Sequence, residues 1–259
     1  MLIRFLSGVV YVAVLVFCIL FSPQSFNYLM LIFCGLCLYE YANLTKLDFN
    51  LTAGLIILSM AILLTNSKLN FISFNQTIQF IKIPYLILLA TIMLITVNGQ
   101  DKLIKKIGSI LFGIVYITVP FYLSLEFLEK GTVFIWFFVF FMVNDTFAYL
   151  IGMKFGKHKL APKISPKKTI EGFVGGFIFS MILGIILYYY YPQNYFNWII
   201  IAFITSILGT VGDLIESKLK REANVKDSSN IIPGHGGFLD RLDSFIFAMP
   251  FIYLYIYNS

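Results

Sequence analysis

The sequence predicts an all-α polytopic membrane protein with about nine transmembrane helices. Of its 259 residues, 59% are hydrophobic and only 12% are charged, about half the charged fraction of a typical soluble domain. The mean hydropathy is +0.86. The apolar runs are also too long and too uniform for the in-and-out alternation of barrel strands. Lipid is therefore the solvent for most of the chain, which argues against a soluble enzyme.

The apolar stretches divide the chain into nine expected spans. They lie at residues 5–21, 26–44, 51–65, 81–97, 107–128, 132–152, 172–191, 197–216 and 240–257. Several are shorter than the ~20 residues of a perpendicular span, so their boundaries are soft. The first stretch runs into Ser22-Pro23 without a small-residue cleavage site, and we interpret it as a span rather than a signal peptide.

Basic residues predict the orientation of these spans. With a cytoplasmic N-terminus and nine alternating helices, 16 of the 19 basic residues fall in cytoplasmic segments, and only Lys68, Lys82 and Lys130 fall outside. An even number of helices would break this asymmetry. The C-terminus is therefore expected outside. Since the positive-inside rule accounts for this distribution, we expect no nucleic-acid partner.

The chain is expected to divide by role into two regions. Residues 1–130 hold spans with few ionisable groups, which suit helix packing and dimer contacts. Residues 131–259 form the expected catalytic region, with cytoplasmic loops at 153–171 and 217–239. Glu40 and Glu126 lie near span boundaries, so we interpret them as interfacial rather than catalytic. The three cysteines lie inside apolar runs and are interpreted as apolar fillers rather than zinc or disulfide ligands.

Two features of the catalytic region precede its densest charge cluster. Asp145 lies near the end of the sixth span, where an ionised carboxylate needs a cation or a metal, although a structural role is an alternative. The loop that follows contains two prolines, which exclude a continuous helix, and a helix is expected to open at about Thr169. A helix N-terminus flanked by lysines suits phosphate oxygens, although the positive-inside rule alone would also produce a basic loop. The candidate phosphate-binding residues are Ser165, Lys167, Lys168 and Thr169.

The charge cluster at 212–243 lies between two apolar stretches. Asp213 ends the eighth span, with Glu216 three residues on, and Asp240 and Asp243 open the ninth span, also three apart. Carboxylates from two helices at one membrane face suit Mg²⁺, which also takes water and phosphate oxygens as ligands. Glycines between the helices let backbone approach a ligand closely, and a salt-bridged loop is the alternative. The cations that could neutralise phosphate here are Lys220, Arg221, Lys226 and Arg241.

This cluster resembles the signature of the phosphatidate cytidylyltransferases, also called CDP-diacylglycerol synthases. The matching residues, with every spacing kept, are Ser217, Lys220-Arg221, Lys226-Asp227, Pro233, His235-Gly236-Gly237, Asp240-Arg241 and Asp243. Upstream pieces from Asp145 to Gly172 resemble the same family, so the resemblance is specific over about 144–243. One departure is Ile170, where many relatives carry an aromatic residue, and we interpret it as a packing change.

The resemblance implies a multi-helix bacterial enzyme of the inner membrane, usually dimeric, with its site on the cytoplasmic face. Such an enzyme joins CTP to phosphatidate, giving CDP-diacylglycerol and pyrophosphate, and requires Mg²⁺. The implied metal ligands are Asp213 and Asp240, with Asp243 close by. The other residues expected to be catalytic are Lys220, Arg221 and His235, the last as a phosphate contact. The expected substrate-binding residues are Asp145, Ser165, Lys167, Lys168, Thr169, Ser217, Lys226, Asp227, Gly236, Gly237 and Arg241.

Two rival functions stay open at this point. A CTP-dependent kinase or cytidylyltransferase acting on another lipid would use a similar site, because acyl chains and lipid backbones cannot be read from residues. A secondary transporter is the rival from another class, but it predicts internal repeats and ionisable residues in mid-span. The charges of this chain gather instead at one membrane face.

Overall fold

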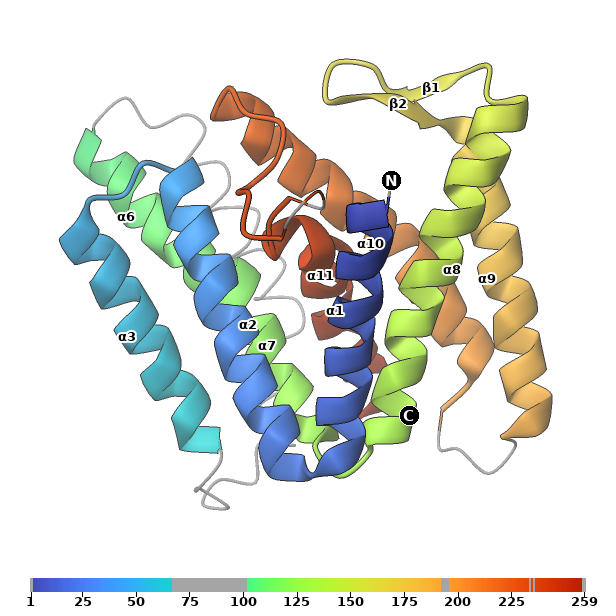
Figure 1. Cartoon of the computed structure of the whole chain (residues 1–259), viewed down its shortest axis with the longest axis horizontal. Coiled ribbons are helices and arrows are strands. Elements are labelled where there is room, and N and C mark those ends of the chain that lie inside the picture. The colour runs from blue at the N-terminus through green and yellow to red at the C-terminus, as the bar shows by residue number, and fades with distance from the viewer. Residues whose placement is uncertain (1, 67–101, 192–195, 233, 235, 258–259) are drawn as a thin grey trace.

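The computed structural model describes residues 2–66, 102–191, 196–232, 234 and 236–257 and shows a helical bundle (Figure 1). The elements in chain order are α1 (Leu2–Phe21), α2 (Pro23–Leu44), α3 (Phe49–Asn66), α6 (Lys102–Gly113), η1 (Ile114–Thr118, π-helical), α7 (Val119–Ser124), η2 (Leu125–Phe127, 3₁₀), α8 (Gly131–Phe155), β1 (Lys159–Ala161), β2 (Ser165–Thr169), α9 (Ile170–Tyr190), α10 (Trp198–Glu222) and α11 (Leu239–Ile256).

Eight of the nine expected spans coincide with helices in the described ranges, and the stretch from α6 to η2 forms one of them. The expected fourth span, 81–97, lies outside the described residues. Five helical segments are long and apolar enough to cross a membrane: Pro23–Leu44, Ile104–Phe127, Gly131–Phe155, Ile170–Tyr190 and Trp198–Glu222. The chain is therefore an all-α membrane protein by length and composition of its helices. The number nine stays a prediction.

The segment between α8 and α9, expected as a loop, contains a short β-hairpin. β1 pairs antiparallel with β2, with Lys159 opposite Thr169 and Ala161 opposite Ser165. Pro162 lies in the turn of this hairpin, which is closed by the Ile164 N–H donating to the Ala161 carbonyl at 3.2 Å, and Pro166 lies in β2. As expected, a helix opens after Thr169, whose hydroxyl caps α9 by accepting from the Gly172 N–H at 3.2 Å.

The helices pack as one bundle rather than two halves. α8, α9, α10 and α11 lie side by side, α1 contacts both α2 and α8, and α11 contacts α2 and α7 as well as α10 (Figure 1). One continuous set of buried apolar side chains runs from Leu15 in α1 to Ile256 in α11. The expected division of roles at residue 130 therefore does not correspond to two separate cores, and it stays a prediction.

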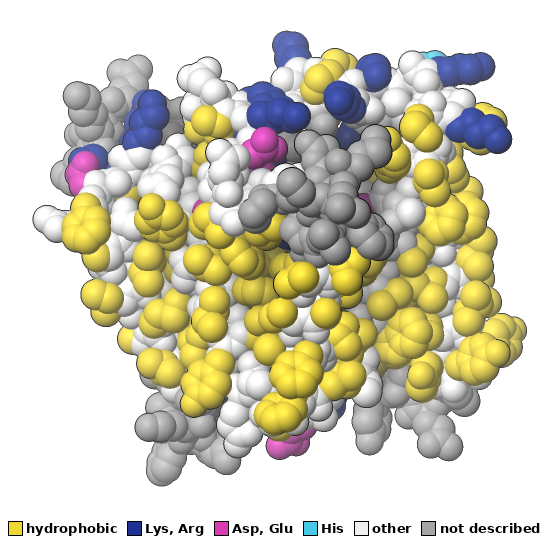
Figure 2. Space-filling view, in the orientation of Figure 1, with side chains coloured by type: hydrophobic (Ala, Val, Ile, Leu, Met, Phe, Trp, Pro, Cys, Tyr) yellow, Lys and Arg dark blue, Asp and Glu magenta, His cyan; other side chains and the backbone are white. Residues whose placement is uncertain are grey.

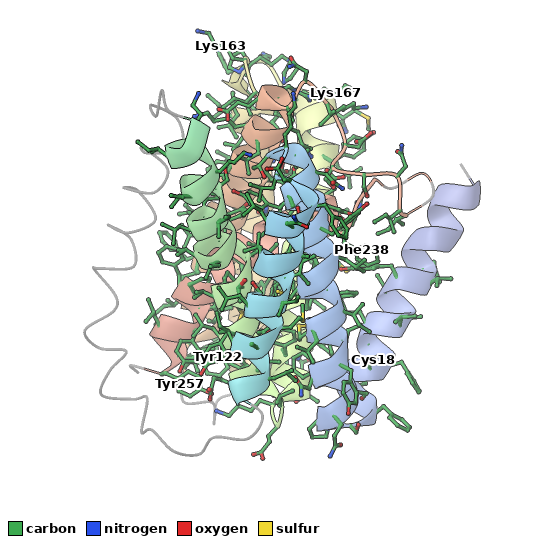
Figure 3. The ribbon with its side chains drawn as sticks, turned by 90° about the vertical axis from the view of Figure 1, so that its left-hand side faces the viewer. Cys18, Tyr122, Lys163, Lys167, Phe238 and Tyr257 are labelled. Carbon is green, nitrogen blue, oxygen red and sulfur yellow. The ribbon has the colours of Figure 1, made fainter. Side chains whose placement is uncertain are left out.

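Charge is distributed unevenly along the bundle. On the face shown in Figure 2, lysine and arginine side chains gather along one end, and the surface below them is mostly apolar. Lys163 and Lys167 lie at this end, and Tyr122 and Tyr257 lie toward the other (Figure 3). This pattern is what the positive-inside rule produces for one membrane face.

Candidate active site

A cavity of about 490 Å³ lies where α8, the hairpin, α10 and α11 meet. Its charged lining residues are Asp145, Lys167, Lys168, Asp213, Asp240, Arg241 and Asp243. Four carboxylates and three cations from four separate elements thus face one space. The expected meeting of acidic side chains from the last two helices is therefore present in this fold.

Asp213 reaches the cavity from α10. One of its carboxylate oxygens pairs with the Lys168 ammonium of β2, and the other accepts a hydrogen bond from the Ser217 hydroxyl at 3.2 Å. Ser217 lies one helical turn after Asp213, so the helix itself brings the two together. Lys168 therefore ties the hairpin to α10 at the cavity wall.

A close contact between α10 and α11 places Asp213 beside Asp243. At Gly212 the two helices approach so closely that a Cβ atom would lie 2.6 Å from the Asp243 carbonyl oxygen and 2.7 Å from the Phe247 Cβ. Small residues at helix contacts are a general device for close packing in membranes. The absence of a side chain at Gly212 thus brings the two acidic residues to the same cavity.

We expect Gly212→Ala to separate these helices, lowering stability by roughly 1–3 kcal/mol because neither backbone can yield without shifting α11. Catalytic turnover should fall as well, since Asp213 and Asp243 move apart. Gly54→Ala is the matched control, because a Cβ there has no neighbour within 4 Å. The melting temperatures of both variants are measured by thermal unfolding in detergent. Equal melting temperatures for the two would contradict the prediction.

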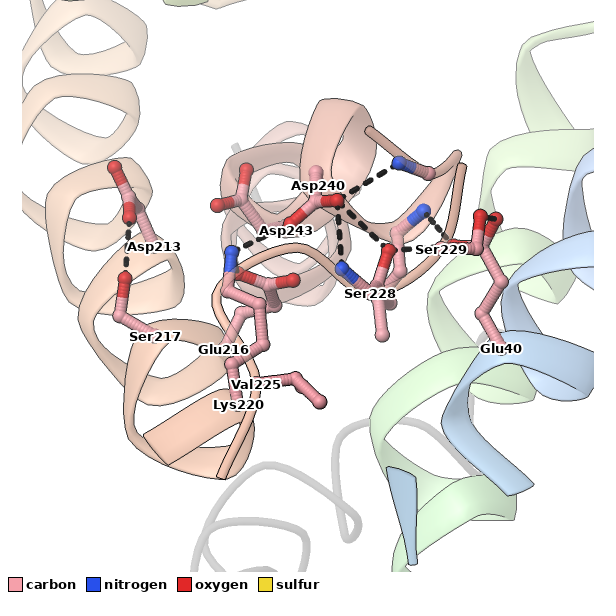
Figure 4. Close-up of polar contacts among 12 residues, drawn as sticks. Glu40, Asp213, Glu216, Ser217, Lys220, Val225, Ser228, Ser229, Asp240 and Asp243 are labelled. Atoms are coloured by element: carbon pink, nitrogen blue, oxygen red, sulfur yellow. Dashed lines mark hydrogen bonds and ion pairs between the residues drawn. The ribbon is translucent and has the colours of Figure 1, made fainter. Parts of the chain in front are cut away.

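Asp240 lies at the start of α11 and is held by four donors (Figure 4). One of its oxygens accepts from Lys220 Nζ at 2.5 Å. The other accepts from the Ser228 N–H at 2.9 Å, the Ser228 hydroxyl at 2.9 Å and the Gly237 N–H at 2.8 Å. Asp240 therefore both lines the cavity and organises the loop that precedes α11.

Lys220 bridges two buried carboxylates. Its ammonium pairs with Glu216 one turn earlier on α10 as well as with Asp240. The side chains of Glu216 and Asp240 are 0% and 8% exposed, and that of Lys220 is 11% exposed. Glu216 was recognised in the sequence as part of the carboxylate cluster but was not proposed as a site residue. Its burial follows from the packing of α10 against α11, which only the tertiary structure shows.

Glu40 corrects an expectation from the sequence. It was interpreted as interfacial, but it is fully buried in α2. Its carboxylate accepts from the hydroxyls of Ser228 and Ser229 and from the N–H groups of Phe238 and Leu239. The interpretation was wrong because these partners lie 188 to 199 residues away in the chain. The one signal available was a carboxylate within an apolar helix.

Several expected site residues do not line this cavity. Arg221 turns away, donating to the carbonyls of Val225 at 2.8 Å and Ile164 at 3.3 Å, so it joins the loop after α10 to the hairpin. The cavity lining also lacks Ser165, Lys226 and Asp227, of which the last two are exposed. His235 lies outside the described residues.

The glycines of the signature shape the wall around Asp240. Gly236 has a φ of +83°, a conformation that other residues rarely adopt. A Cβ on Gly237 would collide with the Ser228 hydroxyl and the Glu40 carboxylate. Both glycines therefore bring backbone close to the protein's own carboxylates, and the close approach to a ligand that the sequence predicts for them stays a prediction.

The carboxylates suit a hard divalent cation by their chemistry, because Mg²⁺ prefers oxygen ligands and usually takes only one or two carboxylates. Among the described residues, no three histidine, cysteine or acidic side chains converge as a metal-binding group. Asp213 pairs with Lys168, Asp240 with Lys220, and Asp243 accepts from the Ser244 N–H at 2.6 Å. The expected metal set of Asp213, Asp240 and Asp243 thus stays a prediction.

An apolar groove of about 260 Å³ adjoins the polar cavity between α1 and α8. The two share Asp145, Asp240, Arg241 and Asp243. The groove walls are otherwise mostly hydrocarbon: Val12, Leu15, Val16, Ile135, Phe138, Val139, Phe141, Met142 and Phe245. Polar cavity and apolar groove together suit an amphiphile whose anionic head lies among charged residues and whose tail lies between helices.

Comparisons with known proteins agree on one family. The cytidylyltransferase family matches residues 2–258. A phosphatidate cytidylyltransferase of Bacillus subtilis (strain 168) is 35% identical over 260 residues, which cover 96% of this chain and 95% of the relative. A protein of the same name from Staphylococcus aureus (strain COL) is 39% identical over 70% of this chain and 72% of its own length.

Proposed function

The chain belongs to the cytidylyltransferase family and is a nucleotidyltransferase, and from this premise we propose that it transfers the cytidylyl group of CTP to phosphatidate. The products are CDP-diacylglycerol and pyrophosphate, for phospholipid biosynthesis. The observation that carries the proposal is the polar cavity that continues into an apolar groove. Such a space can receive a nucleotide's phosphates and a lipid's headgroup at one place while the acyl chains stay in hydrocarbon.

In this reaction an oxygen of the phosphatidate phosphate attacks the α-phosphorus of CTP. The bond from that phosphorus to the bridging oxygen of the β-phosphate breaks, and pyrophosphate leaves with its electron pair. A phosphate monoester has a second pKa near ~6, so the attacking oxygen is already largely ionised at neutral pH and needs no strong base. Catalysis therefore consists mainly of positioning and charge neutralisation.

The main obstacle to the reaction is the repulsion between CTP and phosphatidate, which are both polyanions, and the chain's own cations can reduce it. Lys167, Lys168 and Arg241 line the cavity and can neutralise phosphate oxygens, and a guanidinium can do so with two parallel hydrogen bonds. Lys220 does not line the cavity, but it donates to Asp240, which does. Lys168 has a second role, since it holds the Asp213 carboxylate at the cavity wall.

Asp213, Asp240 and Asp243 are the residues that would hold Mg²⁺. A bound Mg²⁺ would neutralise negative charge on the nucleotide phosphates and on the departing pyrophosphate. Asp213 and Asp243 come from helices held together at Gly212, and Asp240 has a fixed position from its four donors. These constraints favour a preorganised set of oxygens on rigid elements.

The site is proposed to lie at the cytoplasmic leaflet of a bacterial inner membrane, in a homodimer. Basic side chains at the cavity end of the bundle support this orientation through the positive-inside rule. The relatives named above are bacterial proteins, which agrees with that location. The N-terminal helices are the proposed source of dimer contacts.

An assay with two differently labelled nucleotides tests the function. Purified protein in detergent is given phosphatidate, Mg²⁺ and CTP labelled on either its α- or its γ-phosphate. We expect the α-label, and not the γ-label, to enter the organic phase, with release of pyrophosphate. Transfer of the γ-label would indicate a lipid kinase. Incorporation with a lipid other than phosphatidate, and none with phosphatidate, would indicate a cytidylyltransferase for another lipid.

A further inference from the structure

Glu40 is a buried carboxylate that the reaction described above does not use. It lies in α2, is 0% exposed and does not line the polar cavity. Its four hydrogen-bond donors all belong to the segment between Ser228 and Leu239, far away in the chain. The described residues contain no ion pair to Glu40. A buried charge without a cation needs dipoles to stabilise it.

The N-terminus of α11 supplies those dipoles. The N–H groups of Phe238 and Leu239 donate to the two Glu40 oxygens at 2.9 and 2.8 Å. The first N–H groups of a helix have no partner within it, and α11 has no capping side chain of its own at Phe238. Glu40 therefore caps α11 from another helix, and its charge is favourable at the positive end of the helix dipole.

Glu40 is also linked to Asp240 through Ser228 (Figure 4). The Ser228 hydroxyl lies 2.8 Å from Glu40 Oε2 and 2.9 Å from Asp240 Oδ2. Its single hydrogen can serve one carboxylate at a time, while the Ser228 N–H donates steadily to Asp240. The network leaves no room for a side chain at position 237, since a Cβ atom added to Gly237 would collide with Ser228 and Glu40. The two carboxylates thus share one compact network.

We propose that Glu40 is a positioning residue for the reaction: it holds Ser228, Ser229 and the first turn of α11, and thereby aims Asp240 into the cavity. Only the catalytic part of this inference rests on the proposed function, and the effect of Glu40 on the start of α11 does not. Phe238 reinforces the placement, because its ring packs on Phe33 of the same helix as Glu40 at 5.4 Å between centroids. The N-terminal helices therefore contribute to the site and not only to packing.

The test compares Glu40→Gln with Thr118→Val in the full-length protein. Glutamine keeps the size of the side chain but removes one acceptor and turns amide hydrogens toward donors. We expect kcat to fall about 10- to 100-fold, the range for residues that orient a metal-binding group. The Mg²⁺ concentration for half-maximal activity should rise. Without any substrate or metal, amide exchange at Phe238 and Leu239 should accelerate.

Thr118→Val is the matched control because it removes a buried hydrogen bond away from the cavity. The Thr118 hydroxyl donates to Ser59 at 2.7 Å, between η1 and α3. This variant should lower the melting temperature yet keep kcat and the exchange rates of α11. Should Glu40→Gln behave in the same way, Glu40 is structural only and the proposal is overturned.

Ser229→Ala keeps the proposal testable if Glu40→Gln does not fold. It removes one of the four donors, at 2.6 Å from Glu40 Oε1, and leaves the charge and the helix cap. We expect changes in the same direction as for Glu40→Gln but smaller, with kcat lowered about 2- to 5-fold. Unchanged kcat, Mg²⁺ dependence and exchange in this variant would overturn the proposal. If the wild type makes no CDP-diacylglycerol, the proposed function fails, and the exchange measurement still decides the role of Glu40.

Discussion

Asp213→Asn is expected to reduce turnover at least about 100-fold at saturating Mg²⁺, the scale on which a group that stabilises transition-state charge acts. Asn keeps the shape of the side chain but removes the charge that faces the cavity from α10. The change also releases Lys168, whose ion pair with Asp213 joins the hairpin to α10. Both the proposed metal ligand and the wall of the cavity are therefore affected.

Initial rates of CDP-diacylglycerol formation over a range of Mg²⁺ concentrations measure this effect. Glu222→Gln is the matched control, because Glu222 lies on the same helix, is exposed and pairs weakly with Lys218 at 3.8 Å. It should leave turnover unchanged, since exposed pairs contribute little. Turnover near the wild-type value for Asp213→Asn at saturating Mg²⁺ would remove Asp213 from the proposed metal site.

Lys220→Met is expected to destabilise the folded protein by about 3–5 kcal/mol, the scale for removing one partner of a buried ion pair. Lys220 bridges Glu216 and Asp240, whose side chains are 0% and 8% exposed. Without the ammonium, two carboxylates lie close together in an apolar setting with no cation between them. A residue that served only as a phosphate contact would not show this loss of stability.

The double variant Lys220→Met/Glu216→Gln separates the two contributions. Because it removes one of the two uncompensated charges, we expect it to unfold at a higher temperature than Lys220→Met alone. Lys218→Met, two positions away on the exposed side of α10, is the control and should change stability little. Thermal unfolding in detergent measures all three. If Lys220→Met has the same melting temperature as the Lys218→Met control, the buried bridge does not stabilise the fold.

The sequence alone determined the class of the protein, most of its described helices and which carboxylates meet at one cavity. Long uniform apolar runs form helices in lipid because each backbone group must be satisfied within its own segment. The spacing of Asp213, Asp240 and Asp243 predicted carboxylates from two helices at one place, and all three line one cavity. Local rules also predicted the helix that opens after Thr169.

Only the tertiary structure decided how the site is held together. The sequence assigned Glu40 only to the membrane interface, counted Glu216 only within the carboxylate cluster and gave Ser228 no role. In the structure Ser228 donates to Glu40 and to Asp240, and Glu216 pairs with Lys220. Arg221, expected in the site, turns instead to the hairpin. A helical period says which residues share a face, but not which helix covers that face. Contacts between α2 and the start of α11 depend on packing across 198 and 199 residues, which no local pattern encodes.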